Sequence, residues 1–282
     1  MCKIIIMTAH NAANLKTTIA KAWHYFDATG ERDGFGAVWL SPSNQLCWIK
    51  SSAPKLDSRP PRFCLGFAEN ENGHQPSNGG FLLIHGRKAT CDKNATNTHP
   101  MIGHQSTLIH NGIVRSETIE NEETTCDSEL LLIAMKDNNA DRLAEITGYF
   151  AFGMIQPIAS GYQLHVAKDD TAKLFSGRNR SHGYTFGTTP EACQIGDAKT
   201  CYEMRGNTLL TFTGPRKHST RKIPHAPPPA PKPTPAPSPQ KTWPSWESAE
   251  ARDAYFHRYP RQHSNMKDAE SFMFADEPLE NP

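Results

Sequence analysis

The chain has 282 residues, enough to bury a sizeable hydrophobic core in one large domain or two small ones. Its 30 Lys and Arg residues nearly balance its 29 Asp and Glu residues, so the net charge of +1 does not favour nucleic acid or an acidic membrane surface as a partner. No apolar stretch approaches the roughly 20 residues that span a bilayer, no signal peptide opens the chain, and the seven cysteines lack a CxxC pair, so we expect a cytoplasmic protein without membrane attachment.

Cys2 stands directly after the initiator methionine, at the start of an apolar run that predicts a buried strand over residues 2–8. Removal of Met1 would leave Cys2 with a thiol and a free α-amine on the same carbon. An α-amine has a pKa of about 7.7–8, so it can act as the base that activates the thiol. Taken by itself, an inert thiol at position two is the more ordinary interpretation.

The rest of the first 214 residues has a mixed α and β pattern. A helix is predicted over residues 14–26, where apolar residues recur at helical spacing before Gly30. A second helix is predicted over residues 127–136, with Asp127 as its capping residue, and a third over residues 139–147. Further strands are predicted at residues 35–41, 45–50, 80–86, 107–114, 149–156, 161–168 and 208–213. The strands cluster instead of alternating strictly with helices, which indicates an α+β fold with stacked, largely antiparallel sheets.

The composition changes near residue 215. Residues 215–242 are so rich in proline that neither helix nor sheet can form through most of them, and we expect an extended linker. Residues 243–282 are polar and charged, and we expect a disordered tail. A short docking helix around residues 245–258, which contain several aromatic side chains, is the alternative.

Four separated segments carry further residues of chemical interest. They are residues 33–38 (DGFGAV), residues 85–90 (HGRKAT), residues 97–100 (NTHP) with residues 108–113 (LIHNGI) after them, and residues 126–129 (CDSE). Together with Cys2, these motifs and their order resemble the class II glutamine amidotransferase domain, which belongs to the N-terminal-nucleophile (Ntn) hydrolases. The resemblance covers residues 2–214 and is to a stand-alone form, because no synthase domain follows.

The resemblance implies a four-layer αββα sandwich and assigns roles to the matching residues. Cys2 would attack the side-chain amide of L-glutamine, and Asn111 and Gly112 would stabilise the oxyanion. Arg87 and Asp127 would bind the α-carboxylate and α-ammonium of the substrate, with Thr90 and Gly34 lining the substrate pocket. The family uses no metal and no cofactor. We accordingly interpret His85, His99 and His110, whose spacing is poor for a metal site, as core or supporting residues.

A stand-alone glutaminase would need a separate enzyme to accept its ammonia, and we expect such a partner. Two other functions stay open. The first is an amidohydrolase of the same fold that cleaves another γ-glutamyl or small amide. The second is a non-catalytic glutamine-binding module, against which the presence of Cys2, Asn111 and Gly112 argues.

Overall fold

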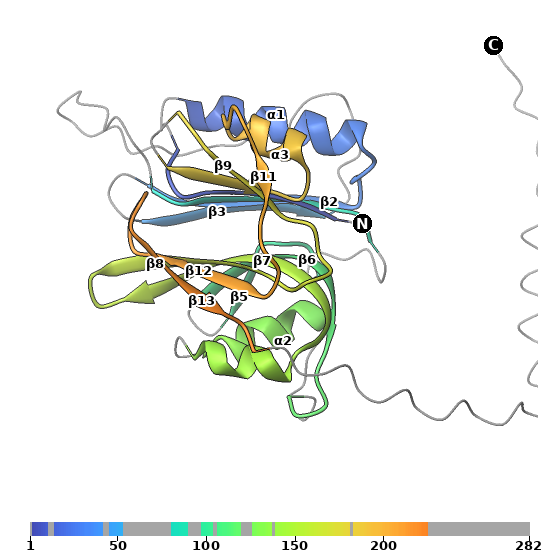
Figure 1. The fold of residues 1–282 in the computed structure, drawn as a ribbon. Helices are drawn as coiled ribbons and strands as arrows, with labels where there is room; N and C mark the ends of the chain where they lie inside the picture. The colour runs from blue at the N-terminus through green and yellow to red at the C-terminus, as the bar shows by residue number, and fades with distance from the viewer. Residues whose placement is uncertain are drawn as a thin grey trace, which may run out of the picture. The chain divides into compact units, whose positions relative to one another are not determined.

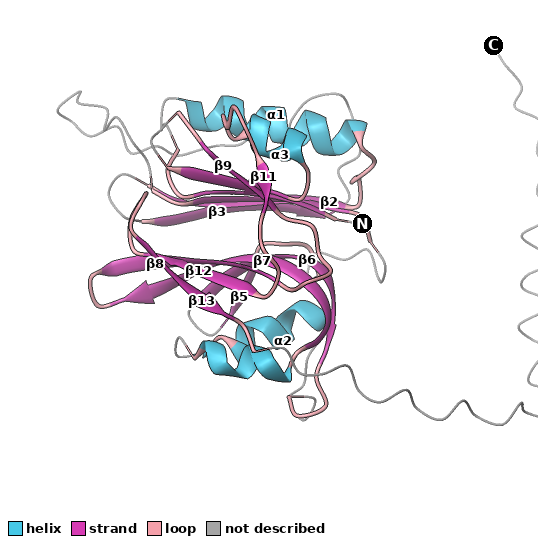
Figure 2. Cartoon of the chain, in the orientation of Figure 1, coloured by secondary structure: helices cyan, strands magenta, loops and turns pink. Residues whose placement is uncertain are grey.

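The structure, a computed structural model, describes residues 2–10, 14–41, 45–52, 80–89, 97–103, 106–119, 126–136, 139–180 and 183–224. Within these residues the chain forms two antiparallel sheets that face one another, with helices on both outer faces (Figure 1 and Figure 2). This four-layer αββα arrangement confirms the fold predicted from the sequence. The fold is of the α+β class.

The first sheet carries the strand that follows Cys2. Its strand order is β11-β9-β10-β1-β4-β2-β3, so β1 lies in the interior of the sheet with β10 and β4 as neighbours. The strands are β1 (Lys3–Met7), β2 (Gly34–Leu40), β3 (Leu46–Ser52), β4 (Leu82–Arg87), β9 (Phe175–Arg178), β10 (Tyr184–Gly187) and β11 (Tyr202–Glu203).

The second sheet carries the HNG triplet. Its order is β13-β12-β8-β7-β6-β5, and each described neighbouring pair is antiparallel. The strands are β5 (Met101–Gly103), β6 (Ser106–Arg115), β7 (Thr147–Ile158), β8 (Gly161–Lys168), β12 (Thr208–Phe212) and β13 (His218–Lys222).

Helices α1 (Leu15–Ala28) and α3 (Pro190–Ile195) cover the first sheet, and α2 (Asp127–Ala134) covers the second, as Figure 1 shows. In α1 the buried residues Leu15, Ile19, Ala22 and Phe26 recur three or four positions apart, which places them on one helix face. The helix ends at Ala28, with Thr29 as its C-cap, before Gly30 with φ of +89°.

The hydrophobic core has three layers, and β1 contributes to two of them. Ile4 and Ile6 point between the two sheets, whereas Ile5 and Met7 point toward α1. All four side chains are buried, so the strand is apolar on both faces. The third layer packs α2 and residues 140–145 against the outer face of the second sheet. The position of Cys2 is therefore fixed by a strand that packs on both faces.

Several sequence predictions need correction. The predicted third helix is a short 3-10 helix, η3 (Ala140–Glu145), which begins after Asn139. Strands β5, β9, β10, β11 and β13 and helix α3 were not predicted. All five of these strands have five residues or fewer and lack a long apolar run, so their pairing partners determine them. A signal for α3 was present, since Thr189 caps the helix and Pro190 occupies its first turn.

The folded region extends past the predicted boundary at residue 214. Strand β13 pairs with β12 over its whole length, and the buried side chain of Ile223 joins the core under α2. In addition, the Thr8 hydroxyl donates a hydrogen bond to the Pro215 carbonyl at 2.6 Å. The rest of the predicted linker and the predicted tail, residues 225–282, lie outside the described residues.

Candidate active site

Cys2 directly precedes β1 and lies at the end of the first sheet where β4 finishes. Its Sγ atom donates a hydrogen bond to the Lys88 carbonyl oxygen at 3.5 Å. Burial raises the pKa of the Cys2 thiol, and the positive charge of Arg87 opposes this shift. A thiol in this environment is protonated at neutral pH, so it needs an adjacent base to become a nucleophile.

Arg87 is the last residue of β4 and is only 4% exposed. In the register of the sheet it lies opposite Gly34 of β2. Asp33 makes two hydrogen bonds to the backbone of residues 87–89. The Asp33 amide donates to the Arg87 carbonyl at 3.0 Å, and the Asp33 carboxylate accepts from the Ala89 amide at 2.9 Å. Thr90, which the sequence analysis also placed in the substrate pocket, lies outside the described residues.

The two glycines of the DGFG turn allow close contact with residues 97–100. A Cβ atom on Gly34 would lie 2.9 Å from the side chain of Thr98. A Cβ atom on Gly36 would lie 2.1 Å from the His99 carbonyl oxygen, which is far inside van der Waals contact. The NTHP segment therefore packs directly on β2, next to the strand that carries Arg87.

Asn111 and Gly112 are neighbours on β6, opposite Ala151 and Phe150 of β7. The Asn111 side chain is 4% exposed, and its Oδ1 atom has no hydrogen-bond partner within the described part of the chain. Gly112 has φ of +155°, and a Cβ atom there would lie 2.1 Å from the Tyr149 carbonyl oxygen. A glycine is thus required at this position of the strand.

Asp127 is half-buried and is the first residue of α2. It is not the capping residue that the sequence predicted, because Cys126 occupies the N-cap position. Instead, the Asp127 carboxylate accepts a hydrogen bond from the Val114 amide of β6 at 3.1 Å. This bond fixes the start of α2 beside β6, two residues beyond Gly112.

Three buried histidines and Ser128 form a hydrogen-bonded network behind these residues. The Ser128 hydroxyl lies 2.9 Å from His110 Nδ1 and 3.1 Å from His99 Nε2, so it hydrogen-bonds both rings. His85 Nε2 donates to the His110 carbonyl at 3.1 Å. Burial lowers the pKa of all three, to about 3 for His85, to about 4 for His110 and well below 6.5 for His99. The rings are therefore neutral near pH 7.

These histidines are buried and hydrogen-bonded within the protein. In the described ranges no group of three or more His, Cys, Asp and Glu side chains is placed to hold a metal ion. Their role is to connect the sheets: His85 pairs with Ile4 of β1, and its ring reaches the residue before Asn111. The structure thereby brings Cys2, Gly34 and Arg87 on the first sheet to the same end of the sandwich as Asn111, Gly112 and Asp127.

Sequence reasoning missed four contributors to this arrangement. Lys88 supplies its carbonyl to Cys2, Thr98 packs on Gly34, and Ser128 bonds two histidines. The fourth, Glu31, is buried and pairs with Lys3 at 3.1 Å, directly beside Cys2. Ser128 belongs to the DSE motif, so a signal for it existed. Lys88 and Thr98 also belong to named motifs, HGRKAT and NTHP, but their contacts, like the ion pair of Glu31, become visible only in the tertiary structure.

Two solved structures have a fold similar to that of this chain. The allosteric regulatory enzyme of purine biosynthesis is similar to this chain with a TM-score of 0.57 and 16% identity, over 79% of this chain and 49% of that one. Glutamine phosphoribosylpyrophosphate (PRPP) amidotransferase from B. subtilis, complexed with ADP and GMP, matches with a TM-score of 0.55 and 17% identity over the same shares.

At this identity the similarity establishes the fold alone. The chain shares this fold with the glutamine PRPP amidotransferase named above. The chain spans about half the length of these solved structures. A scan against protein-family models found no match, and neither did a search of curated protein sequences. No helix in the described part of the chain is long and apolar enough to cross a membrane.

Proposed function

We propose that this protein is a class II glutamine amidotransferase subunit that hydrolyses the side-chain amide of L-glutamine through Cys2. The observation that carries the proposal is the convergence of the motif residues. Cys2 lies against the chain that follows Arg87, and the His85–His110 hydrogen bond joins this end of the first sheet to the strand that carries Asn111 and Gly112. The Ntn-hydrolase fold supports the same conclusion.

The reaction begins with the removal of Met1, which frees the α-amine of Cys2. That amine takes the proton from Sγ, and the thiolate attacks the γ-carbonyl carbon of glutamine. The amine then returns the proton to the departing nitrogen, which leaves as ammonia, and a γ-glutamyl thioester remains on Cys2. Water hydrolyses the thioester and releases glutamate. Because burial raises the pKa of the thiol, a base attached to the same residue is an effective way to deprotonate it.

Asn111 and Gly112 have the role of oxyanion donors in this proposal. Negative charge develops on the carbonyl oxygen during attack, and fixed donors stabilise it because they need no reorganisation. Both residues sit on an interior strand of the second sheet, and Gly112 is held by its close contact with β7. Such rigidity suits a donor pair that must stay in place through both halves of the reaction.

Arg87 and Asp127 would recognise the two charged groups of a free amino acid. A guanidinium presents two parallel donors to a carboxylate, and a carboxylate accepts from an α-ammonium. Asp127 Oδ2 already accepts from Val114, so its orientation is set before substrate binds. Thr90 and Gly34 would complete the pocket wall. Recognition of both groups would select free glutamine over a glutamine inside a peptide.

We further propose that the chain acts in stand-alone form, without a cofactor, in the cytoplasm, and hands its ammonia to a separate acceptor enzyme. The described residues between 2 and 224 include most residues of the glutaminase motifs, and the chain spans about half the length of the solved structures that share its fold. The proline-rich linker and the tail that we predict after it would provide a tether for the acceptor.

The experiment is an assay of ammonia release from L-glutamine by the wild-type protein and by Cys2→Ser. We expect release by the wild type and a loss of at least a thousandfold in Cys2→Ser. The half-buried Cys47 on β3 provides a matched control, because Cys47→Ser changes a thiol in the same sheet away from the site. Release of an amine from a γ-glutamyl amide, with no ammonia from glutamine, would replace the proposal with the amidohydrolase alternative. Equal activity of the wild type and Cys2→Ser would refute both.

A further inference from the structure

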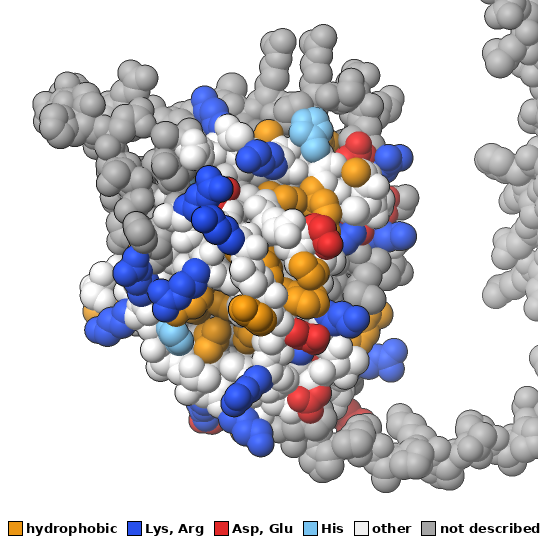
Figure 3. Space-filling view, turned by 45° about the horizontal axis from the view of Figure 1, so that its top comes forward, with side chains coloured by type: hydrophobic (Ala, Val, Ile, Leu, Met, Phe, Trp, Pro, Cys, Tyr) orange, Lys and Arg blue, Asp and Glu red, His pale blue; other side chains and the backbone are white. Residues whose placement is uncertain are grey.

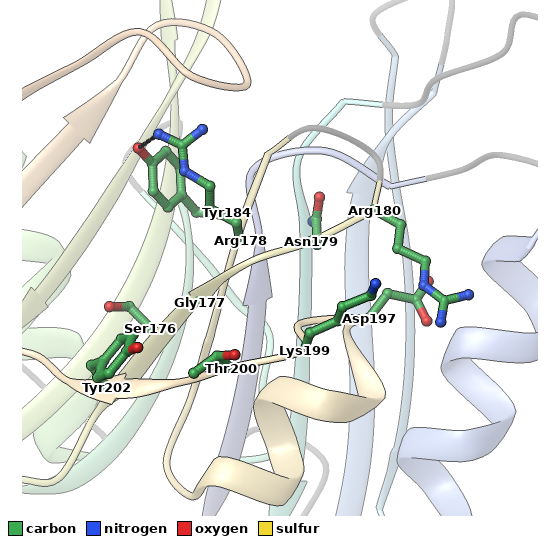
Figure 4. Close-up of a pocket in the computed structure, with 10 residues that line it drawn as sticks. All are labelled: Ser176, Gly177, Arg178, Asn179, Arg180, Tyr184, Asp197, Lys199, Thr200 and Tyr202. Atoms are coloured by element: carbon green, nitrogen blue, oxygen red, sulfur yellow. Dashed lines mark hydrogen bonds between the residues drawn. The ribbon is translucent and has the colours of Figure 1, made fainter.

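A concave site lies apart from Cys2, at the edge of the first sheet that β9 and β11 form. It has a volume of about 600 Å³, within the range of small-molecule sites, and residues of β9, β10 and β11 line it together with the chain that leads into β11 (Figure 4). The strand register separates the two sites. Cys2 lies at the Gly187 end of β10, whereas Tyr184 and Arg178 pair at the opposite end. A ligand bound here would not touch the candidate active site.

The site carries an excess of positive charge. Arg178, Arg180 and Lys199 line it, against one carboxylate, that of Asp197. Neither Arg180 nor Lys199 has an ion-pair partner among the described residues, and both side chains are exposed. Figure 4 shows these two side chains and Asp197 at one end of the pocket. Lys and Arg side chains also gather on the left of the face drawn in Figure 3. An anionic group is the natural occupant of this end.

Arg178 is held in a fixed position. Its guanidinium lies over the ring of Tyr184, 5.4 Å from the ring centroid, and it donates to the Tyr184 hydroxyl at 3.5 Å. The Tyr184 ring in turn packs on Phe186 and Phe212 of the core. Arg178 is therefore engaged by Tyr184, and in Figure 4 it lies apart from Arg180 and Lys199, the two cations at the other end of the pocket.

The other end of the pocket is aromatic. Tyr202 lies opposite Ser176 in the register of β11 and β9, and its side chain is 71% exposed. In Figure 4 it lies with Ser176 and Thr200, away from the Arg180 and Lys199 side chains. An exposed ring of this kind offers a flat surface on which a planar aromatic group can stack. Positively charged side chains at one end of the pocket suit phosphate groups, and the exposed Tyr202 ring at the other end suits a planar base.

We propose that this pocket binds a nucleotide, with its phosphates at Arg180 and Lys199 and its base on Tyr202. A nucleic acid strand fits the surface less well, because strand binding uses successive aromatic residues along a groove. In the described ranges the other strongly exposed large aromatic is Trp48, which lies on β3 at the opposite edge of the same sheet. The pocket thus offers one stacking surface, enough for one base.

The test is isothermal titration calorimetry of the full chain with the four ribonucleoside triphosphates, inorganic tripolyphosphate and adenosine. We expect at least one triphosphate to bind, with tripolyphosphate and adenosine each at least tenfold weaker. Tripolyphosphate lacks the base that would stack on Tyr202, and adenosine lacks the phosphates that would bind Arg180 and Lys199. Failure of all four triphosphates to bind at millimolar concentration would overturn the proposal. Equal affinity for tripolyphosphate and the triphosphates would show that the site binds anions in general, which would also overturn the proposal. A short single-stranded oligonucleotide that bound more tightly than any triphosphate would overturn it as well.

Substitutions of the lining residues test whether the ligand binds in this pocket. Lys199→Gln and Tyr202→Ala should each weaken triphosphate binding about tenfold, which corresponds to 1.4 kcal/mol. Tyr202→Phe keeps the ring and should stay within about twofold. Lys136→Gln, at the end of α2 on the opposite layer, is the matched charge control and should leave binding unchanged. Unchanged affinity in both Lys199→Gln and Tyr202→Ala would contradict the proposal. Ammonia release by these variants should equal that of the wild type, so the result does not depend on the proposed glutaminase activity.

Discussion

The His85 Nε2 atom donates a hydrogen bond to the His110 carbonyl oxygen at 3.1 Å, and this contact joins the two sheets at the candidate active site. His85 pairs with Ile4, two residues after Cys2, and His110 precedes Asn111. The bond therefore places the proposed nucleophile and the proposed oxyanion donor at the same end of the sandwich. The carbonyl oxygen can only accept, so the proton of the neutral His85 ring must be on Nε2.

Replacement of Arg87 by lysine should weaken the use of glutamine, because lysine cannot present two parallel donors to the α-carboxylate. A hydrogen bond to a charged group contributes about 1.5–3 kcal/mol, so we expect kcat/KM to fall roughly 10- to 150-fold, chiefly through a higher KM. Steady-state kinetics of ammonia release measure the change. Arg205→Lys, at an exposed position, is the matched control. An unchanged kcat/KM in Arg87→Lys would show that Arg87 has a structural role only.

Asn111→Ala should lower kcat about 100- to 1000-fold with little change in KM, because an oxyanion donor acts mainly on the transition state. The same kinetic assay measures both constants. Asn139→Ala removes an amide that accepts from Asp141 at the start of η3, so it should affect stability and leave kcat unchanged. If Asn111→Ala raised KM and left kcat intact, Asn111 would belong to substrate binding instead.

Gly36→Ala should destabilise the protein by about 1–3 kcal/mol or more, because the new Cβ atom would lie 2.1 Å from the His99 carbonyl oxygen. The neighbour is backbone of the NTHP segment, so relief requires that this segment move off β2. Urea unfolding measures the change in the free energy of unfolding.

The control for Gly36→Ala is Gly214→Ala. No atom lies within 4 Å of a Cβ at Gly214, so this substitution should change the free energy of unfolding little. Equal stability of the two variants would contradict the packing described for the DGFG turn.

Sequence motifs identified most of the candidate site, because motif residues carry their chemistry in their own side chains. Cys2, Arg87, Asn111 and Asp127 could be named without a structure, and the structure brings them to one end of the sandwich. The catalytic and binding roles of these residues stay predictions, as does that of Thr90, which lies outside the described residues. The main strands and helices were also predictable, because long apolar runs and helical spacing mark them.

The parts that the sequence did not predict depend on distant pairing. Lys88 and Thr98 act through a carbonyl and a packing contact, which their residue types do not indicate. The four-residue strands β9 and β10 exist because each has a partner in the sheet. The pocket at Tyr202 is built from residues 176–184 and 197–202, which the pairing of β11 with β9 brings together, so only the tertiary structure reveals it.

The stability of the protein should fall between pH 6.5 and about 4. Burial lowers the pKa of His10, His110 and His165 to about 4 and that of His85 to about 3. In this window the unfolded chain binds protons that the folded chain excludes, so stability is complete above pH 6.5 and is lost as the pH falls through the folded pKa values. Each such histidine contributes about 1.4 kcal/mol per pH unit.

Urea midpoints at pH 7 and pH 5 measure this loss. His165, whose ring bonds to Gln163 and Thr211, lies apart from the candidate active site. His165→Gln should reduce the difference between the two midpoints while it leaves the glutaminase site intact. Midpoints that do not differ between pH 7 and pH 5 would contradict the burial of neutral histidines.

The most direct test of the proposed function is the intact mass of the purified protein before and after treatment with 6-diazo-5-oxo-norleucine, an electrophilic glutamine analogue. We predict that the mass lacks Met1 and that a single adduct forms on Cys2, absent in Cys2→Ala and retained in Cys47→Ala. A protein that keeps Met1 and gains no adduct would contradict the assignment of Cys2 as an N-terminal nucleophile.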